Sequence, residues 1–255
     1  MAQLYDEKWM PIGHPKEVNE REAVFENLDA QNKLILDAGA GTLRFSLEAI
    51  KKAARQVVAV DVERDMLERG LKKAENLKIK SKIDAILADV RHLPFVNDVF
   101  DDVIAIELFQ HIPGKRRLFL EEIYRVLKNH GCAFVNTWNA IPRIIAGYFG
   151  LTEKRIEVRK AKSRMYYWEN YYRYFFPWEF KHFMLSSPFS EVKILGVHST
   201  FFLPQTEMKT RGELAKASKL LRTLFFLQIT IDKLFRKLSC LNQITGRMLL
   251  AVLRK

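Results

Sequence analysis

Cysteine is scarce in this sequence. Of 255 residues, only Cys132 and Cys240 are cysteines. Two thiols without a CxxC spacing exclude a disulfide framework, and no metal-ligand cluster stands out along the chain. A reducing compartment fits this usage best, so we expect a cytoplasmic protein.

Long apolar runs are also missing. The longest uncharged apolar stretch near the C-terminus is 223–231, well short of the ~20 residues that a membrane-spanning helix needs. The first nine residues are polar and include Asp6 and Glu7, which excludes a signal peptide. The sequence therefore predicts a soluble protein.

The first 150 residues lack any excess of charge. They contain 22 Lys and Arg against 22 Asp and Glu, whereas residues 151–255 contain 20 against 8. The whole net charge of +12 thus belongs to the C-terminal part. Such a part either faces an anionic partner or presents a solvated basic surface.

Apolar residues make up 48% of the chain and charged residues 28%, a composition typical of a folded domain with a sizeable core. Short apolar runs alternate with stretches of helical spacing through the first 140 residues. Continuous apolar strands separated by helices predict a parallel sheet covered on both faces. The expected strands are 33–37, 56–61, 83–89, 102–108 and 131–136, and the expected helices 44–54, 63–76 and 115–127.

The character of the chain changes after residue 140. A basic stretch and then an aromatic run, 166–183, predict a cap over 140–180, inserted after the fifth strand of a single domain that spans residues 1–255. The aromatic run suits either a packed core or a lid that stacks a flat acceptor. Another strand is expected at 191–197. The range 205–255 is expected to hold basic amphipathic helix, mainly 212–240, and a closing strand at 247–253.

The most informative motif is Ile-Leu-Asp-Ala-Gly-Ala-Gly-Thr at 35–42. Asp37 ends a strand, and Gly39 and Gly41 allow a sharp turn in which backbone N–H groups approach a ligand. A dinucleotide fingerprint would need a third glycine at Arg44. An acid before the first glycine suits an amino group rather than a pyrophosphate, and S-adenosylmethionine (SAM) carries an ammonium and a carboxylate but no phosphate.

Two further acids follow the next strands. Asp61 ends the second strand and suits both ribose hydroxyls of a nucleoside, or the N-cap of the helix that follows. Asp89 follows the third strand. Its carboxylate suits an adenine amino group, while a backbone N–H meets a ring nitrogen; a loop acid is the alternative.

The ordered set of motifs resembles the class I SAM-dependent methyltransferases, and most of all the ubiquinone and menaquinone biosynthesis group. The resemblance covers residues 30–138 and rests on five segments: Leu36 to Gly41, Val60-Asp61, Asp89 with Leu93-Pro94-Phe95, Phe100 to Pro113, and Arg125 to Gly131. It implies an α/β, Rossmann-like sheet of seven strands in order 3-2-1-4-5-7-6. Helices cover both faces, and the last strand is antiparallel.

The resemblance also implies roles for single residues. Asp37 would lie near the methionyl ammonium and Asp61 would hold the ribose. Met66 would pack on adenine, and Glu107 would lie beside the methionine moiety. The implied cofactor-binding set is Asp37, Ala38, Gly39, Gly41, Asp61, Val62, Met66, Asp89, Val90 and Glu107. One departure is Leu43, which stands where the family usually has a third glycine and is expected to narrow or shift the loop.

The expected activity is methyl transfer from SAM, with S-adenosylhomocysteine (SAH) as product. In-line transfer depends mainly on positioning, and a weak nucleophile also needs a base; His111 is the candidate, unless it is structural. A small aromatic or lipophilic acceptor is expected first. One alternative acceptor is tRNA, because 134–138 and 171–175 faintly resemble wobble-uridine methyltransferases. Residues 219–237 are also compatible with peripheral membrane contact. A different class of function is a SAM-binding module without catalysis.

Overall fold

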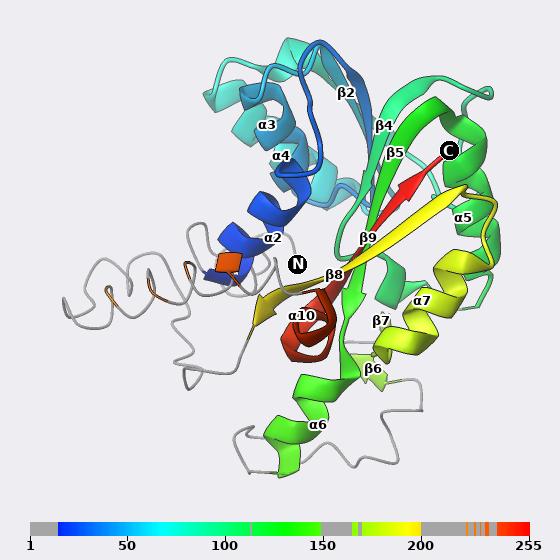
Figure 1. Cartoon of the computed structure of the whole chain (residues 1–255). Coiled ribbons are helices and arrows are strands. Elements are labelled where there is room, and N and C mark those ends of the chain that lie inside the picture. The colour runs from blue at the N-terminus through cyan, green and yellow to red at the C-terminus, as the bar shows by residue number, and fades with distance from the viewer. Residues whose placement is uncertain are drawn as a thin grey trace.

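A seven-stranded sheet forms the centre of the computed structural model, which describes residues 15–112, 114–148, 165–167, 170–199 and 239–255 and five single positions between 223 and 234. The strand order is β3-β2-β1-β4-β5-β9-β8 (Figure 1). Strands β1 to β5 are parallel, and β9 is antiparallel to both β5 and β8. This confirms the predicted order, including the antiparallel closing strand. The bounds are β1 Leu34–Ala38, β2 Gln56–Asp61, β3 Ile83–Leu87, β4 Phe100–Ala105, β5 Leu127–Trp138, β8 Glu191–Ser199 and β9 Gly246–Arg254.

Helices cover the sheet on both faces. One face carries α2 (Pro15–Phe25), α3 (Arg44–Lys51) and α4 (Arg64–Asn76), and the other carries α5 (Arg116–Val126) and α7 (Pro177–Leu185) (Figure 1). Within the described ranges, no helix has both the length and the apolar character that crossing a bilayer requires.

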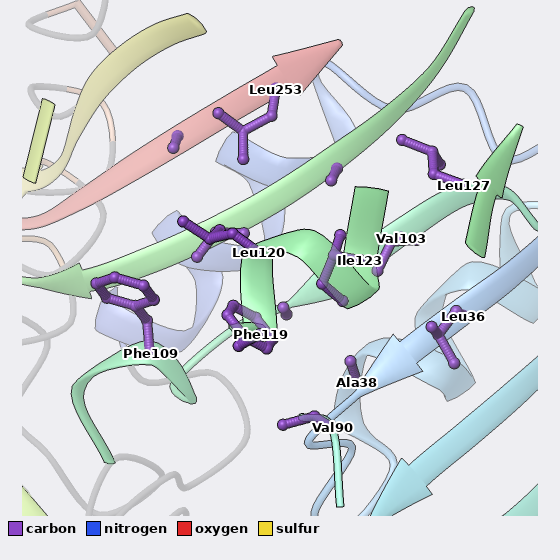
Figure 2. Close-up of a cluster of buried hydrophobic side chains, with 14 of the residues drawn as sticks. Leu36, Ala38, Val90, Val103, Phe109, Phe119, Leu120, Ile123, Leu127 and Leu253 are labelled. Carbon is purple, nitrogen blue, oxygen red and sulfur yellow. The ribbon is translucent and has the colours of Figure 1, made fainter. Parts of the chain in front are cut away.

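The two faces bury separate hydrophobic clusters because successive side chains of a strand point to opposite sides. Ile35 packs with the cluster under α3 and α4, whereas its neighbour Leu36 packs with the cluster under α5. Figure 2 shows the second cluster, in which Phe119, Leu120 and Ile123 of α5 lie over the sheet. Burial on both faces explains why the strands are continuous apolar runs.

Strand β4 ends earlier than the sequence pattern predicts. Apolar residues continue through Ile106 to Leu108, yet the strand stops at Ala105. Glu107 adopts the left-handed conformation, with φ of 60°, which a strand cannot contain. Glu107 therefore lies in a turn at the carboxyl edge of the sheet, and the 3₁₀ helix Phe109–His111 follows it.

The segment after β5 begins with α6 (Ala140–Tyr148), and a two-stranded hairpin follows, β6 (Met165–Tyr167) with β7 (Asn170–Tyr172). Helix α7 begins at Pro177, inside the range expected for the cap, and its Phe180 is buried in the core. Trp178 is 64% exposed. The aromatic run thus contributes to the core and also to the surface. The basic stretch 154–164 lies outside the described residues, as does most of 212–240.

Candidate active site

The glycine turn after β1 is tied to the end of β2. Gly39 N–H donates to the Val60 carbonyl at 2.7 Å, and Gly41 N–H donates to Asp61 Oδ2 at 2.8 Å. Both glycines have positive φ, 72° and 52°, a conformation that carries no steric cost without a Cβ. The turn and Asp61 therefore form one rigid edge where β1 and β2 end.

Leu43 adopts the conformation of a glycine without blocking this turn. Its φ is 64°, and its side chain is fully buried. The side chain packs against Gly70 of α4, where a Cβ would lie 2.9 Å from both the Cβ and the Cδ1 of Leu43. The absence of a side chain at Gly70 makes room for Leu43. Leu43 points toward α4, and the expected narrowing or shift of the loop stays a prediction.

Gly41, which lies next to Asp61, has room for a side chain. A Cβ built on Gly41 would meet nothing nearer than Met66 Cε at 3.9 Å. Val62, the next residue after Asp61, is 61% exposed although it is apolar. Asp61 Oδ1 accepts a hydrogen bond from Glu63 N at 2.9 Å, so the carboxylate is fixed while its remaining lone pairs are available to a ligand.

Asp37 points toward the start of α3. Its Oδ2 accepts hydrogen bonds from Ser46 N at 3.0 Å and Ser46 Oγ at 2.5 Å. Burial raises the pKa of Asp37 from 3.8 to about 6, against the lowering effect of the Ser46 hydrogen bonds. The carboxyl thus holds the glycine turn to α3, and its expected contact with a methionyl ammonium stays a prediction.

Replacing Asp37 by asparagine is expected to remove a pH dependence of stability. Because the folded-state pKa is raised, the Asp37 carboxyl is protonated more in the folded than in the unfolded chain between pH 4 and 6, and its contribution to stability falls as pH rises through that window. About two pKa units correspond to roughly 3 kcal/mol. Urea unfolding at pH 4 and pH 7 should show the wild type losing about that much relative to Asp37→Asn. If the unfolding free energies of wild type and Asp37→Asn differ by the same amount at both pH values, the raised pKa of Asp37 is contradicted.

Asp89 already has a charged partner. Arg91 Nε lies 2.9 Å from Asp89 Oδ1, and Arg91 Nη2 lies 2.5 Å from Oδ2. The hydrogen bonds from Arg91 lower the pKa of Asp89. The Val90 side chain is buried in the core, so this residue can offer a ligand only its backbone. If Asp89 binds the adenine amino group as expected, one of its carboxylate oxygens must accept hydrogen bonds from both Arg91 and adenine.

Glu107 is the centre of a buried polar cluster where β4 and β5 end. Its N–H donates to Asn136 Oδ1 at 2.6 Å, and its Oε2 accepts from Trp138 Nε1 at 3.0 Å and Gln110 Nε2 at 3.1 Å. Lys16 Nζ of α2 lies 3.3 Å from Glu107 Oε1. These partners compensate for the burial of the carboxylate and fix its orientation.

The cluster contains a second acidic residue, Glu20, which lies on α2. Glu20 is buried, and its Oε2 pairs with Arg44 Nη1 at 2.9 Å. Burial raises the pKa of Glu20, and the negative charge of Glu107 raises it further. Burial opposes ionisation of Glu107 too, but Lys16 and the hydrogen bonds from Glu20 and Trp138 lower its pKa. The environment therefore raises the pKa of Glu20 and lowers that of Glu107.

Sequence reasoning missed the contribution of α2. Nothing in the motif pattern marks Lys16 or Glu20, because their role depends on packing against strands far along the chain. The available signal was local: Pro15 at the start of a helical stretch, with Glu17 in its first turn, is typical of a helix N-terminus.

His111 lies at the end of the 3₁₀ helix and is exposed. Its neighbour Gln110 is the residue that contacts Glu107. The role of His111 as a general base stays a prediction.

Comparison with known proteins identifies the central part of the chain. Residues 35–131 match the family model of a methyltransferase domain. The ubiquinone/menaquinone biosynthesis C-methyltransferase UbiE of Haemophilus ducreyi is 35% identical over 99 residues, 38% of either chain. The methyltransferase GfsG of Streptomyces halstedii is 30% identical over 111 residues, 43% of this chain and 40% of that protein. Residues 35–131 form a methyltransferase domain.

Solved methyltransferase structures share the whole fold. A putative SAM-dependent methyltransferase from Listeria monocytogenes superposes with a TM-score of 0.61 at 13% identity, covering 94% of this chain and all of that one. A possible histamine N-methyltransferase from Thermotoga maritima gives 0.58 at 16% identity, covering 93% and 89%. The chain spans only about two fifths of the length of the two curated relatives above.

SAM is the methyl donor of this class of domain, and the site fits it. Gly39 N–H and Gly41 N–H donate to the end of β2, and the Asp61 carboxylate beside the turn is held by Gly41 N–H and Glu63 N–H. Glu107 follows the end of β4, and its expected place beside the methionine moiety stays a prediction. Within the described residues, no cluster of three metal-ligating side chains is present.

Proposed function

We propose that this chain transfers a methyl group from SAM to a small aromatic or lipophilic acceptor and releases SAH. The observation that carries the proposal is the rigid edge formed by the glycine turn and Asp61, in which Gly41 N–H and Glu63 N–H hold the Asp61 carboxylate. That edge suits a nucleoside without a phosphate. A cytoplasmic location is part of the same proposal.

The acceptor part of the proposal rests on aromatic side chains beside Glu107. Trp138 donates to Glu107, and the Tyr174 ring meets the Trp138 ring edge-to-face at 6.1 Å between centroids. Aromatic walls favour flat or apolar molecules. SAM supplies an electrophilic methyl group; the role of these residues is to hold the acceptor in line with it and to exclude water.

A tRNA-modifying activity is the second candidate, and one observation favours it. The segments 134–138 and 171–175, which resemble parts of wobble-uridine methyltransferases, lie side by side: Phe175 N–H donates to the Trp138 carbonyl at 3.0 Å, and Ala140 N–H donates to the Phe175 carbonyl at 2.9 Å. The basic C-terminal part would then face the phosphate backbone.

Radiolabelled methyl transfer tests the proposal directly. The protein is incubated with methyl-labelled SAM and, in parallel, with a small-molecule extract or with total tRNA. We expect label in an extractable small molecule, and less of it with Asp61→Ala at subsaturating SAM. Label in tRNA, with binding that weakens steeply with salt, would favour the second candidate instead. SAH binding without label in either pool would favour a SAM-binding module without catalysis.

A further inference from the structure

Charged groups and aromatic rings form a row that starts at Glu107. Lys16 Nζ lies 3.3 Å from Glu107 Oε1 and 4.3 Å from the Trp138 ring centroid. The Trp138 ring meets the Tyr174 ring edge-to-face. At the far end, the guanidinium of Arg143 lies 5.7 Å from the centroid of Tyr174. The row leads from the predicted methyl-donor end of the site onto α6.

Arg143 lies at the far end of this row, and its guanidinium pairs with no carboxylate among the described residues, unlike those of three other arginines. Arg44, Arg125 and Arg173 each pair with a carboxylate, those of Glu20, Glu122 and Glu179. In contrast, no described carboxylate pairs with Arg143, and its buried Nε has no hydrogen-bond partner among the described residues. A buried N–H without a partner is unfavourable. Such a group persists where a ligand completes it.

The chemistry of the guanidinium defines the ligand. Its N–H groups form a planar fork that matches two oxygens of a carboxylate or phosphate. The neighbouring Tyr174 ring offers an apolar surface to the part of the ligand next to that anion. A neutral aromatic acceptor would leave the fork unused.

We infer that Arg143 binds an oxyanion, carboxylate or phosphate, carried by the methyl acceptor, with the acceptor's unsaturated portion against Tyr174. This inference rests on the proposed function, because it assumes that the reacting atom lies toward Glu107. It narrows the acceptor from aromatic or lipophilic molecules in general to anionic ones.

The test measures binding of small probes to the SAH-loaded full chain by calorimetry. Phenyl phosphate and benzoate are compared with neutral phenol and benzyl alcohol. We expect each anion to bind roughly tenfold tighter than its neutral partner, since a charge-assisted fork is lost with the neutral probe. Parallel titration with total tRNA distinguishes the phosphates of a polynucleotide from those of a small molecule, and either should depend on Arg143.

Matched variants assign the effect to this side chain. Arg143→Gln is expected to remove the roughly tenfold preference for anions, and Arg143→Lys to retain part of it. Arg117→Gln, which removes the same charge from an exposed position on α5, should leave the preference unchanged. Equal binding of anionic and neutral probes, or an unchanged preference in Arg143→Gln, would overturn the inference.

Measuring SAH binding before the probes are added distinguishes failure of the proposed function from failure of this inference. If SAH fails to bind, the methyl-transfer proposal fails, and the probes are still titrated against the unloaded protein. Unchanged SAH affinity in Arg143→Gln shows that the variant is folded.

Discussion

Replacing Asp61 by alanine is expected to weaken SAH binding by about 1–3 kcal/mol, which corresponds to a loss of affinity of roughly fivefold to over a hundredfold. Asp61 Oδ2 holds Gly41 N–H, and Oδ1 holds Glu63 N–H. The substitution therefore removes the ribose acceptor and also releases the glycine turn. Calorimetric titration with SAH measures the change.

Two further variants make the Asp61 result specific. Asp61→Asn keeps one acceptor oxygen, and we expect an intermediate affinity. Asp84→Ala removes an exposed carboxylate near the start of β3, at the opposite edge of the sheet, and should leave SAH binding unchanged. A folded Asp61→Ala protein with wild-type affinity would refute the ribose assignment.

Replacing Gly70 by alanine is expected to destabilise the fold by about 1–3 kcal/mol, the usual cost of overpacking. An alanine in a helix interior normally stabilises by up to ~1 kcal/mol relative to glycine. Here the added Cβ would overlap the Leu43 side chain, which packs against α4 at this point. The expected sign is therefore opposite to that of helix propensity. Urea unfolding at pH 7 measures the free-energy difference.

A double-mutant cycle isolates the contact between Leu43 and Gly70. In a Leu43→Gly background the obstruction is gone, so Gly70→Ala is expected to be neutral or to stabilise by up to ~1 kcal/mol. Equal destabilisation in both backgrounds would mean that Gly70 is required for another reason.

The sheet was predictable from sequence because each buried strand is an apolar run. The pattern also indicated where Asp61 lies, since the carboxyl ends of parallel strands share one edge. Strand β4 shows the limit of this reasoning. Hydrophobicity extends through Ile106 to Leu108, whereas the backbone turns at Glu107, and only the tertiary hydrogen bond to Asn136 Oδ1 reveals why.

The polar cluster could not be derived from sequence for a related reason. Glu107 was expected beside the cofactor, but its partners Lys16 and Glu20 come from α2, and Trp138 comes from the end of β5. Similarly, the sequence shows only that Leu43 replaces the third glycine of the family pattern. The structure shows that its side chain packs against Gly70. Local patterns identify strands and turns, whereas long-range contacts decide which charges meet.

Calorimetric titration of the purified chain with SAH, and with NAD as a control, tests the central claim most directly. The turn at Gly39 and Gly41 lacks the third glycine of a dinucleotide fingerprint, and Asp61 is fixed beside the turn by Gly41 N–H. The account predicts micromolar binding of SAH and no binding of NAD. Binding of NAD, or no binding of SAH, would contradict it.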